Sequence, residues 1–168
     1  FSAMDSRDVE DLWGFLEKYE ATTGGRAMAI PHNSNLSNGR MFPALGSEKM
    51  SESYARQSAR WEPLFEVTQV KGDAETHPLL SPDDPFADFE TWDAGNILAT
   101  EEKTPDMLAT EYARSLLGVG IATHDALDVN PYQFGLIGST DSHTALSTAD
   151  ASNYFGKFAD SEPSIDRT

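Results

Sequence analysis

Three short apolar segments, each bounded by proline or glycine, constrain the fold of this 168-residue chain more than any other feature. They cover residues 26–30, which end before Pro31, residues 63–69, and residues 134–137, which end at Gly138. Apolar runs of this length between turn residues are typical of buried strands. We therefore expect three strands of one sheet.

Patterns typical of helices lie between these strands. Apolar residues at three- and four-residue spacing follow Asp5 or Ser6 and end at Gly24, and a second such pattern begins at Ser47. The third begins at Thr104, a capping hydroxyl that is followed by proline. Alternating helices and strands predict the α/β class with a parallel sheet.

The length and composition limit the classes of protein to which the chain can belong. We expect one domain over residues 1–158 and a flexible polar tail at residues 159–168. The chain has 28 acidic and 12 basic residues, a net charge of −16, which argues against nucleic acid and anionic membranes as partners. Because it has no cysteine, a transition metal would need histidine, carboxylate and water as ligands.

The long connection from residue 70 to residue 103 is rich in proline, aspartate and aromatic residues. A connection of this length in a compact domain is usually functional or disordered. We expect it to be ordered, with a short helix over residues 85–92, because Phe86, Phe89 and Trp92 can pack against the domain.

Polar side chains of the types that bind metals lie at or near the end of each predicted strand. His32 follows the first strand, Glu66 lies in the second, and Asp141 and His143 follow the third. In an extended chain Asp141 and His143 point to the same side, and the carboxyl ends of parallel strands meet at one edge of a sheet. The sequence therefore predicts a divalent metal site at this edge.

Metal-assisted hydrolysis is the chemistry that this pattern favours, since a bound metal lowers the pKa of its water. The chain contains no Gly-x-Ser-x-Gly, Gly-x-x-x-x-Gly-Lys or His-Glu-x-x-His motif. Arg40 lies in a polar loop after His32, and its planar guanidinium suits a phosphate or carboxylate. The alternatives are an ordinary hydrogen-bonded histidine at His32, a solvent-facing Glu66, and a surface ion pair at Arg40.

Four segments of the chain carry a resemblance to a known family: AIPHNSNLSNGRMF, EPLFEVTQVKGDAETHP, FADFETWDAGN and NPYQFGLIGSTDSHTAL. From residue 28 to residue 146 they resemble the C-terminal half of a large bacterial family of unknown function. The resemblance places that family in the PHP-like superfamily of metal-dependent phosphoesterases (polymerase and histidinol phosphatase type). It implies a distorted (β/α)7 barrel, with parallel strands alternating with helices, and two or three ions of manganese, zinc or iron.

The resemblance also implies roles for individual residues. His32, Asp141 and His143 match metal ligands of the superfamily, and Glu66 matches a residue at the end of the preceding strand. Asp141, His143 and Arg40 are the predicted catalytic residues, and Arg40 is assigned as the contact to a small-molecule phosphate ester by its position alone.

One motif of that superfamily is missing, because its members begin with His-x-His and this chain has no such motif. We therefore expect a partial barrel whose intact parent is a phosphoesterase, and which is itself weakly active or inactive. Two alternatives stay open: a non-catalytic binding domain with a remnant metal site, and a metallohydrolase of sulfate esters or amides. Exposed sheet edges in a partial barrel would favour a homodimer.

Overall fold

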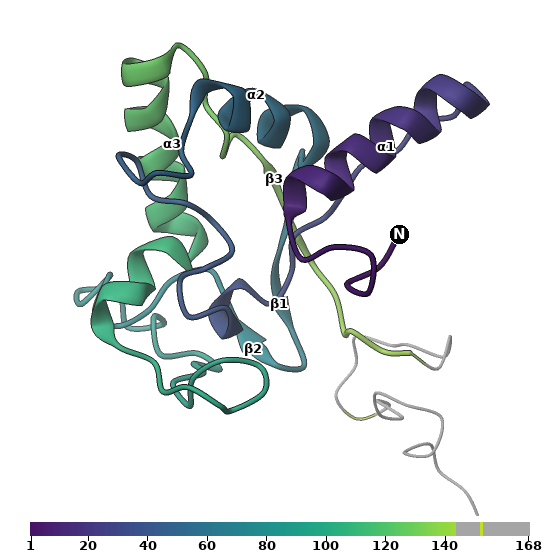
Figure 1. The fold of residues 1–168 in the computed structure, drawn as a ribbon. Coiled ribbons are helices and arrows are strands. Elements are labelled where there is room, and N and C mark those ends of the chain that lie inside the picture. Colours follow the sequence, from purple (N-terminus) through teal and green to yellow (C-terminus); the bar gives the residue numbers. More distant parts are fainter. Residues whose placement is uncertain (144–151, 153–168) are drawn as a thin grey trace, which may run out of the picture.

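The structure is a computed structural model that describes residues 1–143 and 152. In chain order its elements are α1 (Val9–Thr23), the 3-10 helix η1 (Ser34–Leu36), α2 (Glu52–Trp61), β1 (Leu64–Gln69), β2 (Gly72–Asp73), the 3-10 helix η2 (Pro105–Thr110), α3 (Ala113–Leu127) and β3 (Gly135–Gly138). Figure 1 shows α2 and α3 on one side of the strands, with α1 extending away from them. In the described part of the chain, no helix is long and apolar enough to cross a membrane.

The three strands form an open mixed sheet in the order β2-β1-β3. β1 and β3 are parallel, with Phe65 opposite Leu136, whereas β1 and β2 are antiparallel, with Thr68 opposite Asp73. The expected partial (β/α)7 barrel is therefore wrong for residues 1–143. Only Val70 and Lys71 separate β1 from β2, a connection that allows a hairpin but is too short for the crossover that parallel strands need.

The first predicted strand, residues 26–30, is an extended segment rather than a strand. Ala29 N donates to Trp61 O at the end of α2 (2.8 Å), and Glu66 N of β1 donates to Pro31 O (3.0 Å) just after the segment. Pro31 has no N–H group to donate, so a regular ladder cannot continue through it. The segment nevertheless carries His32 to the side of β1.

The helices begin later in the chain than the sequence predicts. Asp8, not Asp5 or Ser6, caps α1, because its side chain accepts a hydrogen bond from the backbone of the first turn. Ser51, not Ser47, caps α2 in the same way. The helix that was expected from Thr104 is divided into η2 and α3. In α1 and α2 the observed cap is a later hydroxyl or carboxylate, whereas the predicted Thr104 is the N-cap of η2.

The long connection contains β2 and turns, and no helix forms at residues 85–92. Phe86 is 80% exposed and Phe89 is 62% exposed, so the prediction that they pack is wrong. Trp92 is half-buried, and its Nε1 donates to Gly95 O (3.0 Å). Asp84 stabilises the local turn by accepting from Phe86 N (2.9 Å), which leaves the Phe86 ring in solvent.

Aromatic side chains from distant segments make up most of the core. The ring of Phe42 lies 5.2 Å from Phe65 of β1 and 5.4 Å from Tyr132, and all three residues are buried. Edge contacts at these distances are favourable beyond the area they bury. Phe42 therefore attaches the loop that carries Arg40 to the sheet.

Candidate functional site

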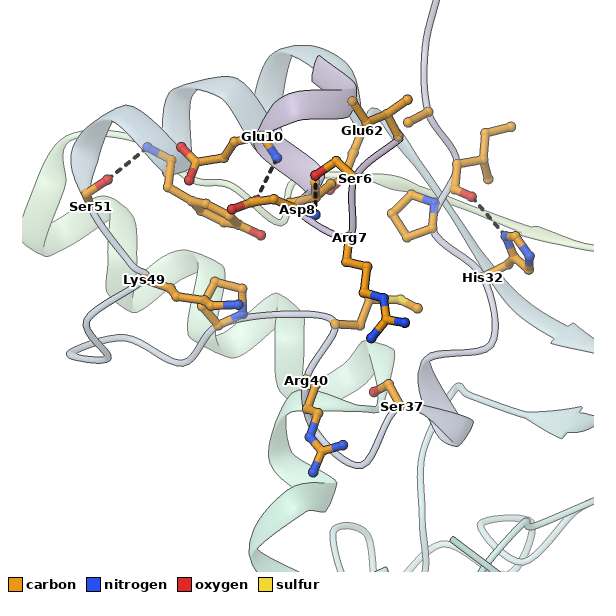
Figure 2. Close-up of a pocket in the computed structure, with 18 of the residues that line it drawn as sticks. Ser6, Arg7, Asp8, Glu10, His32, Ser37, Arg40, Lys49, Ser51 and Glu62 are labelled. Atoms are coloured by element: carbon orange, nitrogen blue, oxygen red, sulfur yellow. Dashed lines mark hydrogen bonds between the residues drawn. The ribbon is translucent and has the colours of Figure 1, made fainter. Parts of the chain in front are cut away.

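A cleft of about 1090 Å³ opens beside the N-terminal end of α1 (Figure 2). Its walls come from residues 6–12, 29–32, 37–43 and 48–54, together with Glu62 at the end of α2. Tertiary packing thus brings five separate parts of the chain to one concave surface, the usual setting of a small-molecule site.

Three basic side chains and one histidine line this cleft: Arg7, Arg40, Lys49 and His32. Arg40 pairs with Glu101 across 2.5 Å, and both side chains are exposed. Arg7 and Lys49 have no hydrogen bond or ion pair with any side chain in the described part of the protein. Four acids, Asp8, Glu10, Glu48 and Glu62, line the same cleft, so an anion would be favoured only beside the two cations that lack acidic partners.

A polar atom beside these cations also lacks a partner. The hydroxyl oxygen of Ser37 is buried and, among residues 1–143, makes no hydrogen bond. Ser37 lines the cleft, and in the view of Figure 2 the side chain of Arg7 extends toward Ser37 and Arg40. A hydroxyl donor between two guanidinium groups suits the oxygens of a phosphate or sulfate group.

A buried ion pair stabilises the loop that carries Ser37 and Arg40. Lys103 Nζ lies 2.8 Å from Glu111 Oε2, and both side chains are almost fully buried. Lys103 also donates to Asn35 O (2.6 Å), and Glu111 accepts from Gly39 N (3.3 Å). Burial raises the pKa of Glu111, and its hydrogen bond from Lys103 opposes that shift. The sequence contains no local signal for this pair, because its members act on a loop more than sixty residues away.

Glu62 is the buried acid of the cleft, and the sequence analysis did not identify it as a site residue. It is 7% exposed, Trp13 Nε1 lies 3.3 Å from its Oε1, and Ser58 Oγ lies 3.4 Å from its Oε2. Burial raises the pKa of Glu62 to about 7, and the two hydrogen bonds only partly oppose this shift. Its position after a polar helix indicates an exposed residue, so only the tertiary structure shows a group that titrates near neutral pH.

Two of the residues predicted for the site lie in the cleft. His32 is exposed, with Nδ1 3.3 Å from Ile30 O, and Arg40 lies on the loop beyond η1. Glu66, Asp141 and His143 do not line the cleft. Glu66 follows the fully buried Phe65 in β1, so its half-buried side chain points to the opposite face of the sheet.

Asp141 and His143 lie just beyond β3. The Asp141 carboxylate forms an ion pair with Lys71, and His143 Nε2 is 3.9 Å from Asp141 Oδ1. Within residues 1–143 and 152, no three His, Cys, Asp or Glu side chains form a group that could hold a metal ion. The ammonium of Lys71 also opposes a cation at Asp141. The described donors thus do not make up the predicted four-ligand site, and its metal assignment stays a prediction.

The fold and the cleft define a small α/β domain with a mixed three-stranded sheet and a concave surface that both basic and acidic side chains line. The sequence model of the family "Protein of unknown function (DUF3604)" matches residues 1–168, so the chain belongs to this family. No curated protein and no solved structure matches the chain. The predicted membership of the PHP-like superfamily is corrected by this result, because the family found is DUF3604 and no comparison supports that superfamily.

Proposed function

We propose that this domain binds a small molecule carrying a tetrahedral oxyanion, of the phosphate-ester class, in the cleft beside α1. The observation that carries the proposal is the presence of Arg7 and Lys49 without acidic partners in the described part of a strongly acidic chain. The buried hydroxyl of Ser37 adds a hydrogen-bond donor that the domain itself leaves unused.

The chemistry of these groups favours an anion over a neutral ligand. Guanidinium and ammonium groups donate charge-assisted hydrogen bonds to phosphate oxygens, each worth about 1.5–3 kcal/mol when partly desolvated. Four acids also line the cleft: the Asp8 carboxylate accepts from the backbone of α1, Glu62 is buried, and Glu10 and Glu48 are exposed to solvent, which screens their charge. The surrounding acidic surface repels anions, so binding is expected to be local to the cleft.

Titration calorimetry with inorganic phosphate tests this proposal. Arg7→Gln and Lys49→Gln are expected to weaken binding at least about fivefold each, since each removes one charge-assisted contact. Arg26→Gln and Lys18→Gln are matched controls, because they remove the same charges outside the cleft and are expected to change affinity less than about twofold. Absence of phosphate binding, or equal losses in all four variants, would contradict the proposal.

Metal-dependent hydrolysis of a phosphate ester is the second candidate function. It rests on the sequence pattern, in which His32, Asp141 and His143 follow segments that lie along β1. His32 also lines the cleft in which the ester would bind. A divalent ion such as manganese, zinc or iron would activate water for this hydrolysis. A sulfate ester or an amide is the alternative substrate.

Metal content and hydrolysis test the second candidate together. The chain is purified without a histidine tag, and bound manganese, iron and zinc are measured with turnover of aryl phosphate, aryl sulfate and amide substrates. His143→Ala is expected to lose the metal and the turnover, whereas His124→Ala, an exposed histidine of α3, is expected to keep both. Turnover that persists after metal removal would contradict this candidate.

A further inference from the structure

We infer that Glu62 is the residue that makes oxyanion binding in the cleft depend on a proton, so that the cleft accepts the anion only while this carboxyl is neutral. This inference rests on the proposed anion binding and adds to it a residue that selects when the ligand binds.

The contacts of Glu62 provide few hydrogen-bond donors to its ionised form. Ser58 Oγ lies 3.3 Å from Pro131 O and 3.4 Å from Glu62 Oε2. Ser58 is the donor in both contacts, and its hydroxyl has one hydrogen to share between the Pro131 carbonyl and the Glu62 carboxyl. The Glu62 carboxylate would therefore receive only part of a hydrogen bond from Ser58. The other carboxyl oxygen accepts from Trp13 Nε1 (3.3 Å).

The charged groups around Glu62 do not offset its ionisation. Among the described residues no cation forms an ion pair with it, and its partners are the neutral side chains of Trp13 and Ser58. Asp8 and Glu10, at the start of α1, lie close enough to Tyr54 that their negative charges, with that of Glu62, add to the effect of burial in raising the pKa of the Tyr54 phenol. Asp8, Glu10 and Glu48 already line the cleft, so ionised Glu62 would add a fourth carboxylate to its lining.

The remaining titratable neighbours stay uncharged near neutral pH. Burial is the main cause that raises the pKa of Tyr54 and of Tyr132, and the negative charge of Glu62 adds to both shifts. The cations that line the same cleft are Arg7, Arg40 and Lys49, which keep their charge over the same range. Glu62 is thus the buried acid of the cleft whose charge changes with pH, because burial raises its pKa to about 7.

Loss of this proton would place a poorly solvated negative charge in the wall that receives the anion. The anion and the carboxylate then repel each other in a region of low dielectric constant. By reciprocity, anion binding raises the affinity of Glu62 for its proton, and binding above neutral pH takes up a proton.

Calorimetric titration of the full chain with sodium sulfate tests the inference, because sulfate stays a dianion throughout. Wild-type affinity is expected to fall about tenfold from about pH 6 to about pH 8, as the neutral fraction of Glu62 falls. Glu62→Gln stays uncharged and is expected to lose this dependence, changing by less than about twofold. His32→Gln is the control for the histidine of the cleft and is expected to keep the tenfold change.

A second measurement needs no variant. Wild-type heats of sulfate binding at about pH 8, in two buffers of different ionisation enthalpy, are expected to differ because a proton is taken up. Equal heats, or full pH dependence in Glu62→Gln, would overturn the inference while the proposed anion binding stands. Failure of the wild-type chain to bind sulfate at either pH would overturn the proposed function itself.

Discussion

Trp13 of α1 donates its indole N–H to the carboxyl of Glu62 at the end of α2, across 3.3 Å in the buried interior. Trp13 is fully buried, and its ring lies 5.0 Å from that of Tyr54. Because Glu62 also lines the cleft, one carboxyl belongs both to the packing of the two helices and to the candidate binding site. Stability and anion binding are therefore expected to depend on the same proton.

The variant Glu62→Gln is expected to change how stability depends on pH. Burial raises the pKa of Glu62 from an ordinary value of 4.5 to about 7, so the folded chain holds the proton more tightly than the unfolded chain. This contribution to stability is fully present below the unfolded pKa and is lost as pH rises through the folded pKa. Over this pH range the free energy of unfolding of the wild type should fall by about 3 kcal/mol. The variant should not show this fall. Urea denaturation at a series of pH values measures it, and parallel curves would refute it.

Replacement of Trp13 by phenylalanine removes the indole donor and keeps an aromatic ring in the core. The free energy of unfolding is expected to fall by about 1–2 kcal/mol, and by more above neutral pH, where the Glu62 carboxylate needs its donors most. Trp92→Phe is the matched control, because it removes a hydrogen bond to Gly95 in a half-buried loop. Thermal and urea unfolding of both variants test the difference, and equal losses would contradict it.

The variant Lys103→Met is expected to destabilise the domain by about 3–5 kcal/mol, because it leaves the Glu111 carboxylate buried without its cation. The double variant Lys103→Met/Glu111→Gln should recover part of this loss, since it removes the unpaired charge. Arg56→Met breaks an exposed pair with Glu52 and is expected to change stability by less than about 0.5 kcal/mol. Chemical denaturation measures the free energy of unfolding of all three variants. A loss in Lys103→Met no larger than the loss in Arg56→Met would contradict a stabilising role for the buried ion pair.

Alanine at Gly39 is expected to destabilise the loop that carries Ser37 and Arg40. Gly39 has a φ of 70°, and an added Cβ would lie 3.0 Å from Met107 O. Gly46→Ala provides the matched control, with a φ of 83° and open space around the position of the Cβ. Both variants carry backbone strain of about 1 kcal/mol, so the excess loss in Gly39→Ala measures the contact with η2. The prediction fails if the two melting temperatures fall equally.

Parts of the site can be predicted from the sequence where local signals agree. His32 and Arg40, from the polar loop after the first apolar segment, line the cleft, and their roles there stay predictions. The same reasoning does not find Arg7 or Lys49, because single basic residues near helix starts are common on protein surfaces. It also does not find Glu62, since an acid after a polar helix carries no local sign of burial.

The amino-acid sequence by itself determined the elements whose signals lie within a few residues. These include the apolar runs that become β1 and β3 and the glycine that ends α1 at Gly24. Backbone propensity, capping and turn geometry act between near neighbours, so a sequence pattern contains their causes.

Only the tertiary structure decided how these elements combine and what they do. An open mixed sheet replaced the expected barrel, because the pairing of a strand depends on partners far along the chain. The cleft is built from segments as distant as residues 6 and 62, and Glu62 is desolvated by contact with Trp13, 49 residues away. Burial and charge pairing are properties of distant contacts, which no local pattern contains.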